Sequence, residues 1–372
     1  MRAISDDPGL ELQLIATGMH LSQEFGLTYR KIESDGFVFD AKIEMLLSSD
    51  SATAISKSMG LGLIGFADAF EALRPDIVIL LGDRFEIFVA AQAAMVARIP
   101  IAHISGGEIT EGGIDDSIRH GISKMALYHF VSAESYRRRV IQMGEDPARV
   151  MNCGDPGREN IYRLTLLSRD DLSKELGFDL TGPFFLVTYH PETLTGVSHA
   201  AAVNELFAAL DLFPHHRIVI TKANADEGGR QINEMIDRYA ERRRDRVYVS
   251  IALGQINYLS AMSYCEAVIG NSSSGIVEAP ALLRATVNIG DRQTGRLMAK
   301  SIVCCGHSRD EIAGAIRTAI SAEFKEQLIH TRSLYGKGTT STFIKDYLKN
   351  IELRGVIKHF YDLPDRDAAM RN

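Results

Sequence analysis

The chain has 372 residues, of which 45% are hydrophobic and 24% are charged, and its formal net charge is −7. This length predicts two domains, because a single hydrophobic core rarely grows so large. The acidic excess argues against a protein that coats nucleic acid and favours a soluble enzyme. We see no charged leader followed by an apolar segment, and no apolar run approaching ~20 residues. We therefore expect neither a signal peptide nor a membrane span, and a cytoplasmic location.

The first half of the chain is predicted to alternate strands and helices. In chain order we expect a strand at 10–16, a helix at 52–73, a strand at 77–81, a helix at 86–97, a strand at 99–104, a helix at 115–127, a strand at 129–132, a helix at 134–143 and a strand at 150–152. This order is typical of parallel βαβ units, whose ligands bind beyond the carboxyl ends of the strands. The turn-forming run at 152–157 predicts a domain boundary.

Charged side chains follow these strand ends. They are four carboxylates, two arginines and a histidine: Asp83, Arg84, Glu108, Asp115, Asp116, Arg119 and His120. We expect them to converge on one crevice, since the carboxyl ends of parallel strands share one edge of the sheet. Each acid could instead cap a helix or complement its dipole. So many acids beside bases favour proton transfer on a polar, anionic substrate.

The second half repeats this architecture without repeating the sequence. We expect strands at 184–189, 217–221, 247–251, 267–269 and 285–289, and helices at 199–212, 231–242, 257–264 and 276–283. A last helix at 342–361 is expected to cross back to the first domain. None of the four cysteines has a metal-ligand spacing, so we expect reduced thiols and no metal site.

Two loops of the second half suit an anion. The segment at 270–275 (GNSSSG) joins a strand to a helix, so its backbone N–H groups and its three hydroxyls could bind phosphate. Glu278 could then accept hydrogen bonds from a ribose. An ordinary serine cap with a first-turn acid is the alternative. The loop at 291–296 adds Arg292 and Arg296 at the same edge, which favours the anion site.

Two further loops carry polar side chains beyond strand ends. His190 follows the strand at 184–189 and is well placed for a phosphate or a leaving group, or is simply a capped loop histidine. Asn224 and Asp226 follow the next strand, and they fit nucleotide contacts and solvent-facing turn chemistry equally well.

Together these residues resemble the UDP-N-acetylglucosamine 2-epimerase family, specifically its hydrolysing branch from sialic and legionaminic acid pathways. The resemblance covers residues 10–361 and rests on several motifs in order and in register. They are LGDRFEI, AHISGGE, DDSIRHGISKM, HPET, NAD at 224–226, GNSSSGIVE and GDRQTGR. It implies an α/β fold of GT-B architecture, in which two Rossmann-like domains face across a cleft. We expect a catalytic domain at 1–160 and 343–372 and a UDP-binding domain at 161–342.

The resemblance also implies the chemistry and the site. Removal of the C2 proton with anti loss of UDP gives a 2-acetamidoglycal, and water then adds to give the C2-inverted free sugar. The implied catalytic residues are Asp83, Glu108, Asp115, Asp116, Arg119 and His190. The implied UDP-binding residues are Arg84, Asn224, Asp226, Ser272, Ser273, Ser274, Glu278 and Arg292. No metal or redox cofactor is expected, and the family implies a homodimer or homotetramer.

The sequence departs from the family pattern in two places. Relatives carry a glutamate where this chain has Ser105, and the nearest acid is Glu108. The family's opening strand and its arginine-bearing loop do not occur ahead of the strand at 10–16. From this we expect low activity and poor solubility for the chain as written, restored by the missing segment.

Several activities fit this sequence. The first is hydrolysing epimerisation of UDP-N-acetylglucosamine to N-acetylmannosamine and UDP. The second is the same reaction on UDP-2,4-diacetamido-2,4,6-trideoxyglucose, and the small side chain of Ser105 hints at room for a bulkier 4-substituent. A GT-B glycosyltransferase and a non-catalytic sugar-nucleotide binder are the further alternatives. Release of free sugar without an acceptor would exclude both.

Overall fold

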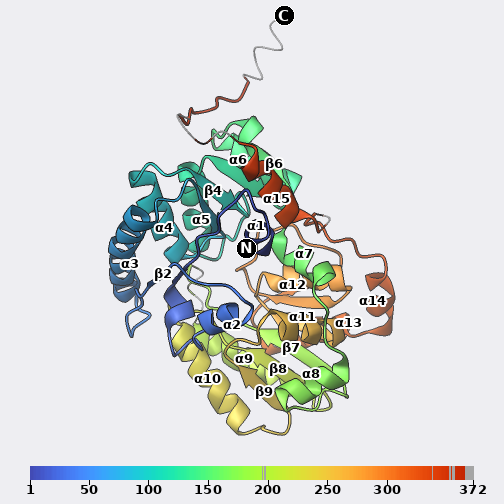
Figure 1. Cartoon of the computed structure of the whole chain (residues 1–372). Helices are drawn as coiled ribbons and strands as arrows, with labels where there is room; N and C mark the ends of the chain where they lie inside the picture. Colours follow the sequence, from blue (N-terminus) through green and yellow to red (C-terminus); the bar gives the residue numbers. More distant parts are fainter. Residues whose placement is uncertain (195, 197, 337, 352, 354–356, 365–372) are drawn as a thin grey trace, which may run out of the picture.

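The computed structural model places the chain in two α/β units, each built on a parallel sheet (Figure 1). It describes residues 1–194, 196, 198–336, 338–351, 353 and 357–364. The carboxyl ends of both sheets contribute loops to one cavity, which therefore lies between the two units. This confirms the predicted class of two Rossmann-like domains that face across a cleft.

The first sheet has four parallel strands in the order β3-β4-β5-β6. These strands are β3 (Val78–Leu81), β4 (Ile101–Ile104), β5 (Tyr128–Val131) and β6 (Val150–Asn152). The helices that connect them are α4 (Phe85–Val96), α5 (Asp115–Met125) and α6 (Glu134–Gln142). All of them lie within a few residues of their predicted positions, because the strands are short apolar runs that alternate with longer helical segments.

The amino-terminal region differs from the prediction. The strand expected at 10–16 is reduced to β1 (Ile15–Thr17), which pairs in parallel with β2 (Ala41–Ile43) in a separate two-stranded sheet. The amide of Leu14, just before β1, donates a hydrogen bond to the Asp40 carboxylate at 2.6 Å. Among the described residues, no strand pairs with the outer edge of β3. The other elements here are α1 (Arg2–Ser5), η1 (Gly18–Leu21), α2 (Tyr29–Ser34) and the correctly predicted α3 (Ala52–Leu73).

The second sheet has six parallel strands in the order β12-β11-β10-β7-β8-β9. They are β7 (Phe184–Thr188), β8 (Arg217–Thr221), β9 (Val247–Ser250), β10 (Ala267–Gly270), β11 (Ala285–Ile289) and β12 (Ile302–Cys305). The helices that follow the first sheet in the chain are α7 (Pro156–Arg163), α8 (Arg169–Leu176), α9 (His199–Leu210), α10 (Gly229–Glu241), α11 (Gln255–Tyr264), α12 (Ser274–Val277), α13 (Arg309–Ala319) and α14 (Ala322–Leu328). The 3-10 turn η3 (Ala279–Leu282) follows α12, whereas the 3-10 turn η2 (Pro147–Arg149) directly precedes β6 of the first sheet. The prediction omitted β12, α7, α8, α13 and α14, although α13 opens with a capping box of Ser308 and Glu311, which is a readable signal.

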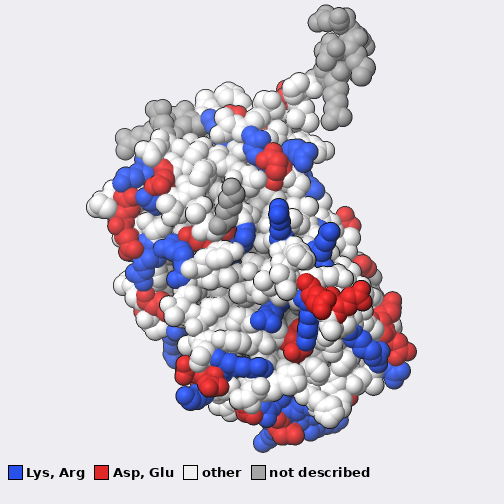
Figure 2. All heavy atoms as spheres, turned by 90° about the vertical axis from the view of Figure 1, so that its right-hand side faces the viewer, with Lys and Arg blue, Asp and Glu red and all other residues white. Residues whose placement is uncertain are grey.

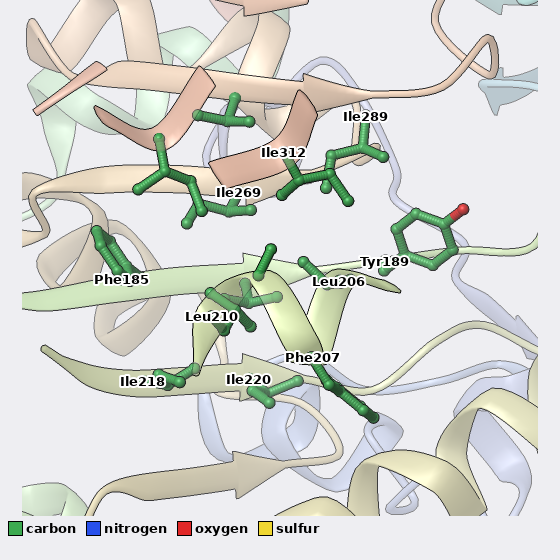
Figure 3. Close-up of a cluster of buried hydrophobic side chains, with 14 of the residues drawn as sticks. Phe185, Tyr189, Leu206, Phe207, Leu210, Ile218, Ile220, Ile269, Ile289 and Ile312 are labelled. Atoms are coloured by element: carbon green, nitrogen blue, oxygen red, sulfur yellow. The ribbon is translucent and has the colours of Figure 1, made fainter. Parts of the chain in front are cut away.

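One core of the second domain lies between its sheet and the helices α9, α10 and α13, and a second lies on the opposite face against α8 and α11. Figure 3 shows the apolar side chains that fill the first of these cores, including Phe185, Leu206, Phe207, Leu210, Ile218, Ile220, Ile269, Ile289 and Ile312. Burying a side chain of this size contributes about 1.5–3 kcal/mol. The sheet is thereby a rigid base for the loops at its carboxyl edge.

The chain crosses back to the first domain through α15 (Thr340–Lys349). Tyr347 of this helix packs edge-on against Tyr128 and Phe130 of β5, with ring centroids 5.9 and 5.5 Å apart. The crossing was predicted, but the expected helix at 342–361 is too long. It ends at Lys349, and the described residues beyond it are not helical, while 352 and 354–356 lie outside the described residues.

The surface carries charges of both signs. On the face drawn in Figure 2, basic and acidic side chains are interspersed, and neither sign covers the whole face. The longest helix, α3, has 22 residues. No helix in the described part of the chain is both long enough and apolar enough to cross a membrane.

A carboxyl-terminal segment holds the end of α5. Lys358 donates hydrogen bonds to the carbonyls of Lys124 and Ala126, both at 2.6 Å, and forms a 2.7 Å ion pair with Glu145. Burial alone would raise the pKa of Glu145, but hydrogen bonds from His129, Lys124 and Lys358 outweigh it and lower the pKa to about 2. A lysine at a helix carboxyl end also complements the helix dipole.

Replacing Lys358 with methionine should lower the free energy of unfolding by about 1–3 kcal/mol, because charged hydrogen bonds to the end of α5 are lost. Urea denaturation at neutral pH measures this change. The matched control is Lys174→Met, which removes a lysine whose side chain is 78% exposed and should cost less than about 0.5 kcal/mol.

Lowering the pH should narrow the difference in the free energy of unfolding between the wild type and Lys358→Met. The ion-paired Glu145 contributes stability above its ordinary pKa of 4.5, and that contribution disappears as pH falls through about 2. Equal losses for the Lys358 and Lys174 variants at neutral pH would contradict the assigned role of Lys358.

Candidate active site

A cavity of about 300 Å³ lies between the two domains, at the lower end of the sizes typical of ligand sites. Its lining residues are Asp83, Arg84, Thr110, Asp115, His190, Asn224, Ser272, Ser273, Arg292, Gln293 and Arg296. All but Thr110, Gln293 and Arg296 belong to the site predicted from the sequence. The predicted residues that lie behind or beside the lining are Glu108, Asp116, Arg119, Asp226, Ser274 and Glu278.

Arg119 is the buried centre of the first domain's half of the site. Its side chain is 1% exposed and forms an ion pair with Asp83. It also donates hydrogen bonds to the carbonyl of Glu108 at 3.0 Å and to the hydroxyl of Thr110 at 3.1 Å. One guanidinium from α5 therefore fixes the loops after β3 and β4 and orients the Asp83 carboxylate into the cavity wall.

The two adjacent acids at the start of α5 have different surroundings. Asp115 lines the cavity and lies 3.2 Å from Arg292 of the second domain. Burial raises the pKa of Asp115, and the Arg292 charge offsets only part of that effect. Asp116 does not line the cavity, and its carboxylate accepts a 2.8 Å hydrogen bond from the amide of Thr110, which does. Asp115 is thus the better placed of the two for proton transfer.

Glu108 lies behind the cavity wall. Its side chain accepts a 2.7 Å hydrogen bond from the Ser132 hydroxyl and forms a 2.8 Å ion pair with Arg296. In this arrangement Glu108 orients Arg296, which does line the cavity. Ser105 is not among the lining residues, so its small side chain gives no argument for a bulky substrate substituent.

Arg84 of the first domain pairs with an acid of the second domain and still has N–H groups that could bind a ligand. Its Nη1 is 2.5 Å from the carboxylate of Asp226, and its Nε is 3.7 Å from that of Glu86. The buried Nε and Nη2 atoms have no hydrogen-bond acceptor in the described part of the chain. Buried N–H groups without acceptors are costly. They suit an anion that enters the cavity.

His190 is held by its backbone. Asn271, fully buried, accepts a hydrogen bond from the His190 amide at 2.7 Å and donates one to the His190 carbonyl at 2.9 Å. Burial, with help from the charge of Arg292, lowers the pKa of His190 to about 3, so the ring is neutral at pH 7. The Asn224 amide donates to Nδ1 at 3.4 Å. The Nε2 atom then carries the proton and can donate it in a hydrogen bond.

The serine loop delivers two of its three hydroxyls to the cavity. Ser272 and Ser273 line it, whereas the Ser274 hydroxyl lies 2.5 Å from the hydroxyl of Tyr258. The single helix predicted at 276–283 is wrong. The structure has a four-residue α-helix, α12, followed by the 3-10 turn η3. Pro280 explains the break, since proline cannot donate the hydrogen bond that an α-helix requires.

Glu278 and Asp155 form a half-buried acidic pair beside the serine loop. Burial, together with the charge of Asp155, raises the pKa of Glu278 to about 8, and burial with the charge of Glu108 raises that of Asp155 to about 6. A Cβ atom on Gly157 would come within 2.8 Å of the Glu278 carboxylate. The glycine therefore leaves room for the acid predicted to bind a ribose.

The loop after β11 supplies the three lining residues Arg292, Gln293 and Arg296. Gln293 donates to the carbonyl of Asn271 at 2.8 Å, which ties this loop to the serine loop. Arg296 was visible in the sequence as the second arginine of the loop. Gln293 and Thr110 carried no signal that could have distinguished them from ordinary loop residues.

Among the described residues, no group of three or more histidine, cysteine or acidic side chains could hold a metal ion. The four cysteines are free, and none lines the cavity. Burial raises the pKa of the Cys153 and Cys265 thiols to about 12. Both are therefore protonated at neutral pH, which makes them poor nucleophiles.

Comparisons with known proteins agree along nearly the whole chain. The family model described as UDP-N-acetylglucosamine 2-epimerase matches residues 2–349. A Campylobacter jejuni protein named GDP/UDP-N,N'-diacetylbacillosamine 2-epimerase (hydrolyzing) is 42% identical, across 97% of this chain and 94% of that protein. A Legionella pneumophila protein named UDP-N,N'-diacetylbacillosamine 2-epimerase (hydrolyzing) is 32% identical, across 96% of this chain and 93% of that protein.

Solved structures share the fold. The UDP-GlcNAc 2-epimerase of Methanocaldococcus jannaschii, in complex with UDP-GlcNAc and UDP, matches with a TM-score of 0.77 and 14% identity, across 93% of this chain and 94% of that chain. A Staphylococcus aureus MnaA–UDP co-structure matches with a TM-score of 0.74 and 14% identity, across 97% of this chain and 94% of that chain. At this identity the likeness supports the GT-B fold alone.

Replacing Asp155 with asparagine should lower the pKa of Glu278 below about 8, because the charge of Asp155 is, after burial, the main cause that raises it. Carbon-13 NMR of protein labelled at glutamate side-chain carboxyls would follow the titration. The matched control is Asp170→Asn, an exposed acid in the first turn of α8, which should leave the titration unchanged. A Glu278 pKa that is unmoved by Asp155→Asn would contradict the coupling.

Proposed function

The chain belongs to the UDP-N-acetylglucosamine 2-epimerase family, whose members are 2-epimerases of UDP-sugars, and we propose that it is a hydrolysing 2-epimerase of UDP-N,N'-diacetylbacillosamine, that is UDP-2,4-diacetamido-2,4,6-trideoxyglucose. The names of the Campylobacter and Legionella relatives support this substrate. UDP-N-acetylglucosamine, the substrate that the sequence analysis placed first, becomes the alternative. The products would be UDP and 2,4-diacetamido-2,4,6-trideoxymannose.

The observation that carries the proposal is that two carboxylates, Asp83 and Asp115, line one cavity together with three arginines. In the proposed first step a carboxylate takes the C2 proton, the C1–O bond breaks, and its electron pair leaves with the diphosphate of UDP. A C1–C2 double bond remains. In the second step water supplies the hydroxyl at C1, and a proton adds to C2 from the opposite face. No redox reagent is consumed.

Asp115 is the proposed base of the first step. Its raised pKa makes it a stronger base than an exposed aspartate. Asp83, held by Arg119, is the proposed second acid–base group. The roles predicted for Glu108, Asp116 and Arg119 become positioning roles, since these residues contact lining residues and do not line the cavity themselves.

The departing diphosphate needs positive charge and hydrogen-bond donors. Arg84, whose Nε and Nη2 atoms have no acceptor among the described residues, and Arg292 are the proposed charged contacts. The hydroxyls of Ser272 and Ser273 and the Nε2–H of neutral His190 are the proposed neutral donors. Donors that are fixed before the reaction stabilise charge as it develops on the leaving group.

We also propose a nucleotide site, domain bounds, a location and an oligomeric state for this protein. Glu278 would accept hydrogen bonds from the ribose hydroxyls, and Asn224, Asp226 and Ser274 would contribute to the nucleotide site. The proposed domains are 1–160 with 343–372 for catalysis and 161–342 for UDP. We propose that the protein is cytoplasmic and forms a homodimer or a homotetramer. The glycosyltransferase alternative would need an acceptor and would have no use for the paired carboxylates.

The deciding experiment is proton NMR of the purified protein in heavy water with UDP-N,N'-diacetylbacillosamine, its GDP counterpart and UDP-N-acetylglucosamine in separate samples. We expect UDP release and a manno-configured free sugar with deuterium at C2 from the first. Faster turnover of UDP-N-acetylglucosamine would replace the proposed substrate but keep the reaction. Turnover that requires an added acceptor would reject the reaction itself.

Two substitutions across one ion pair should separate catalysis from binding. Asp115→Asn should reduce kcat about 10²–10⁴-fold and leave UDP affinity within about tenfold, since Arg292 keeps its charge. Arg292→Gln should weaken UDP binding about 10–100-fold. Turnover by NMR and UDP binding by calorimetry measure the two effects.

The pH profile adds a test of Asp115. Because the pKa of this base is raised above its ordinary 3.8, kcat/KM of the wild type should fall at a correspondingly higher pH as acid protonates it.

The control for Arg292→Gln is the exposed Arg309→Gln variant, which also loses one positive charge. Equal losses of kcat and UDP affinity in Asp115→Asn and Arg292→Gln would contradict the division of roles.

A further inference from the structure

His103 lies behind the candidate active site and touches two of its loops. It is the third residue of β4, and its side chain is fully buried. Its Nε2 lies 2.8 Å from the carbonyl oxygen of Gly82, and its Nδ1 lies 3.0 Å from the hydroxyl of Ser123. Gly82 directly precedes Asp83, and Ser123 belongs to α5, the helix that carries Asp115. One imidazole therefore links β3, β4 and α5.

The partners fix the tautomer of this ring. A carbonyl oxygen can only accept, so Nε2 carries the proton and donates to Gly82. Nδ1 is then the acceptor, and the Ser123 hydroxyl donates to it. Burial lowers the pKa of His103 to about 3, against the opposing effect of the hydrogen bond to Gly82 and with help from the nearby His129 and His120, so the ring is neutral at working pH. Both ring nitrogens are satisfied, and the geometry is unambiguous.

The surrounding backbone leaves little freedom for another arrangement. Gly82 has a φ of +84°, in the left-handed region that favours glycine, so the chain turns sharply just before Asp83. A Cβ atom on Gly106 would lie 2.9 Å from the Ser123 hydroxyl and 3.1 Å from Nδ1 of His103. The glycine thus leaves space for the histidine–serine contact.

We propose that His103 is a positioning residue for the reaction, because it holds the Gly82–Asp83 turn and α5 in the relative placement that lets Asp83 and Asp115 face one substrate. It touches neither the cavity nor a charged partner, so it acts only through the groups that it orients. This inference rests on the proposed function. A shift of about 1 Å in a catalytic group costs up to about 100-fold in rate.

The test compares His103→Leu, which removes both hydrogen bonds, with His103→Gln, which keeps a side-chain N–H that can reach Gly82. We expect kcat to fall about 10–100-fold in the leucine variant and to recover most of that loss in the glutamine variant. UDP affinity should stay within about twofold in both, since the proposed UDP contacts are mainly on the second domain. Ser123→Ala, which removes only the other partner, should lie between wild type and His103→Leu.

A structural role alone would give a different pattern. Equal loss of kcat in the leucine and glutamine variants, or a parallel loss of kcat and UDP affinity, would overturn the proposal. If His103→Leu does not fold, the glutamine and Ser123→Ala variants carry the test, and unchanged kcat in both would overturn it.

Nitrogen-15 NMR of histidine-labelled wild type keeps this inference separable from the proposed function. We expect His103 to remain in the neutral Nε2–H form between pH 5 and 8, whether or not either sugar nucleotide turns over. Protonation in that range, or the Nδ1–H form, would overturn the placement of His103 even if the enzyme is active. Absence of turnover with the expected spectrum would reject the function and leave the geometric link in place.

Discussion

The first domain's half of the site depends on one buried guanidinium. Arg119 leaves α5 and reaches two other loops, where it pairs with Asp83 and donates to the Glu108 carbonyl and the Thr110 hydroxyl. A buried charge is tolerated only when its hydrogen bonds are satisfied, and removing one partner of a buried ion pair costs about 3–5 kcal/mol. These contacts therefore restrict the position of α5 relative to the two loops. Asp115, one turn earlier on the same helix, lies at the cavity wall as a result.

Opposite charges from the two domains meet around the cavity. Three ion pairs join the domains: Asp115 with Arg292 at 3.2 Å, Glu108 with Arg296 at 2.8 Å, and Asp226 with Arg84 at 2.5 Å. The first domain supplies the acid in the first two pairs and the arginine in the last. The arginines suited to an anionic ligand are thus also the groups that join the domains. Binding and domain placement consequently share the same charges.

The sequence predicted most of the elements that carry the site, because the strands of both parallel sheets are short apolar runs followed by polar loops. It did not predict what each polar side chain does once folded. Glu108 follows a strand just as Asp83 does, yet it lies behind the cavity wall and pairs with Arg296 of the other domain, a partner that is distant in sequence. Asp116 directly follows Asp115, yet it does not line the cavity, and its carboxylate accepts a hydrogen bond from the Thr110 amide. The direction in which Ser274 points likewise depends on Tyr258, a contact that no local pattern encodes.

The return of α15 to the first sheet has a consequence for synthesis on the ribosome. Tyr347 covers β5 only after nearly 350 residues of chain have emerged, whereas every strand of the second sheet, from β7 to β12, is available before then. The domain that is translated first is thus the one whose packing is completed last. Until then its nascent sheet presents apolar surface, the kind of exposure that general chaperones recognise.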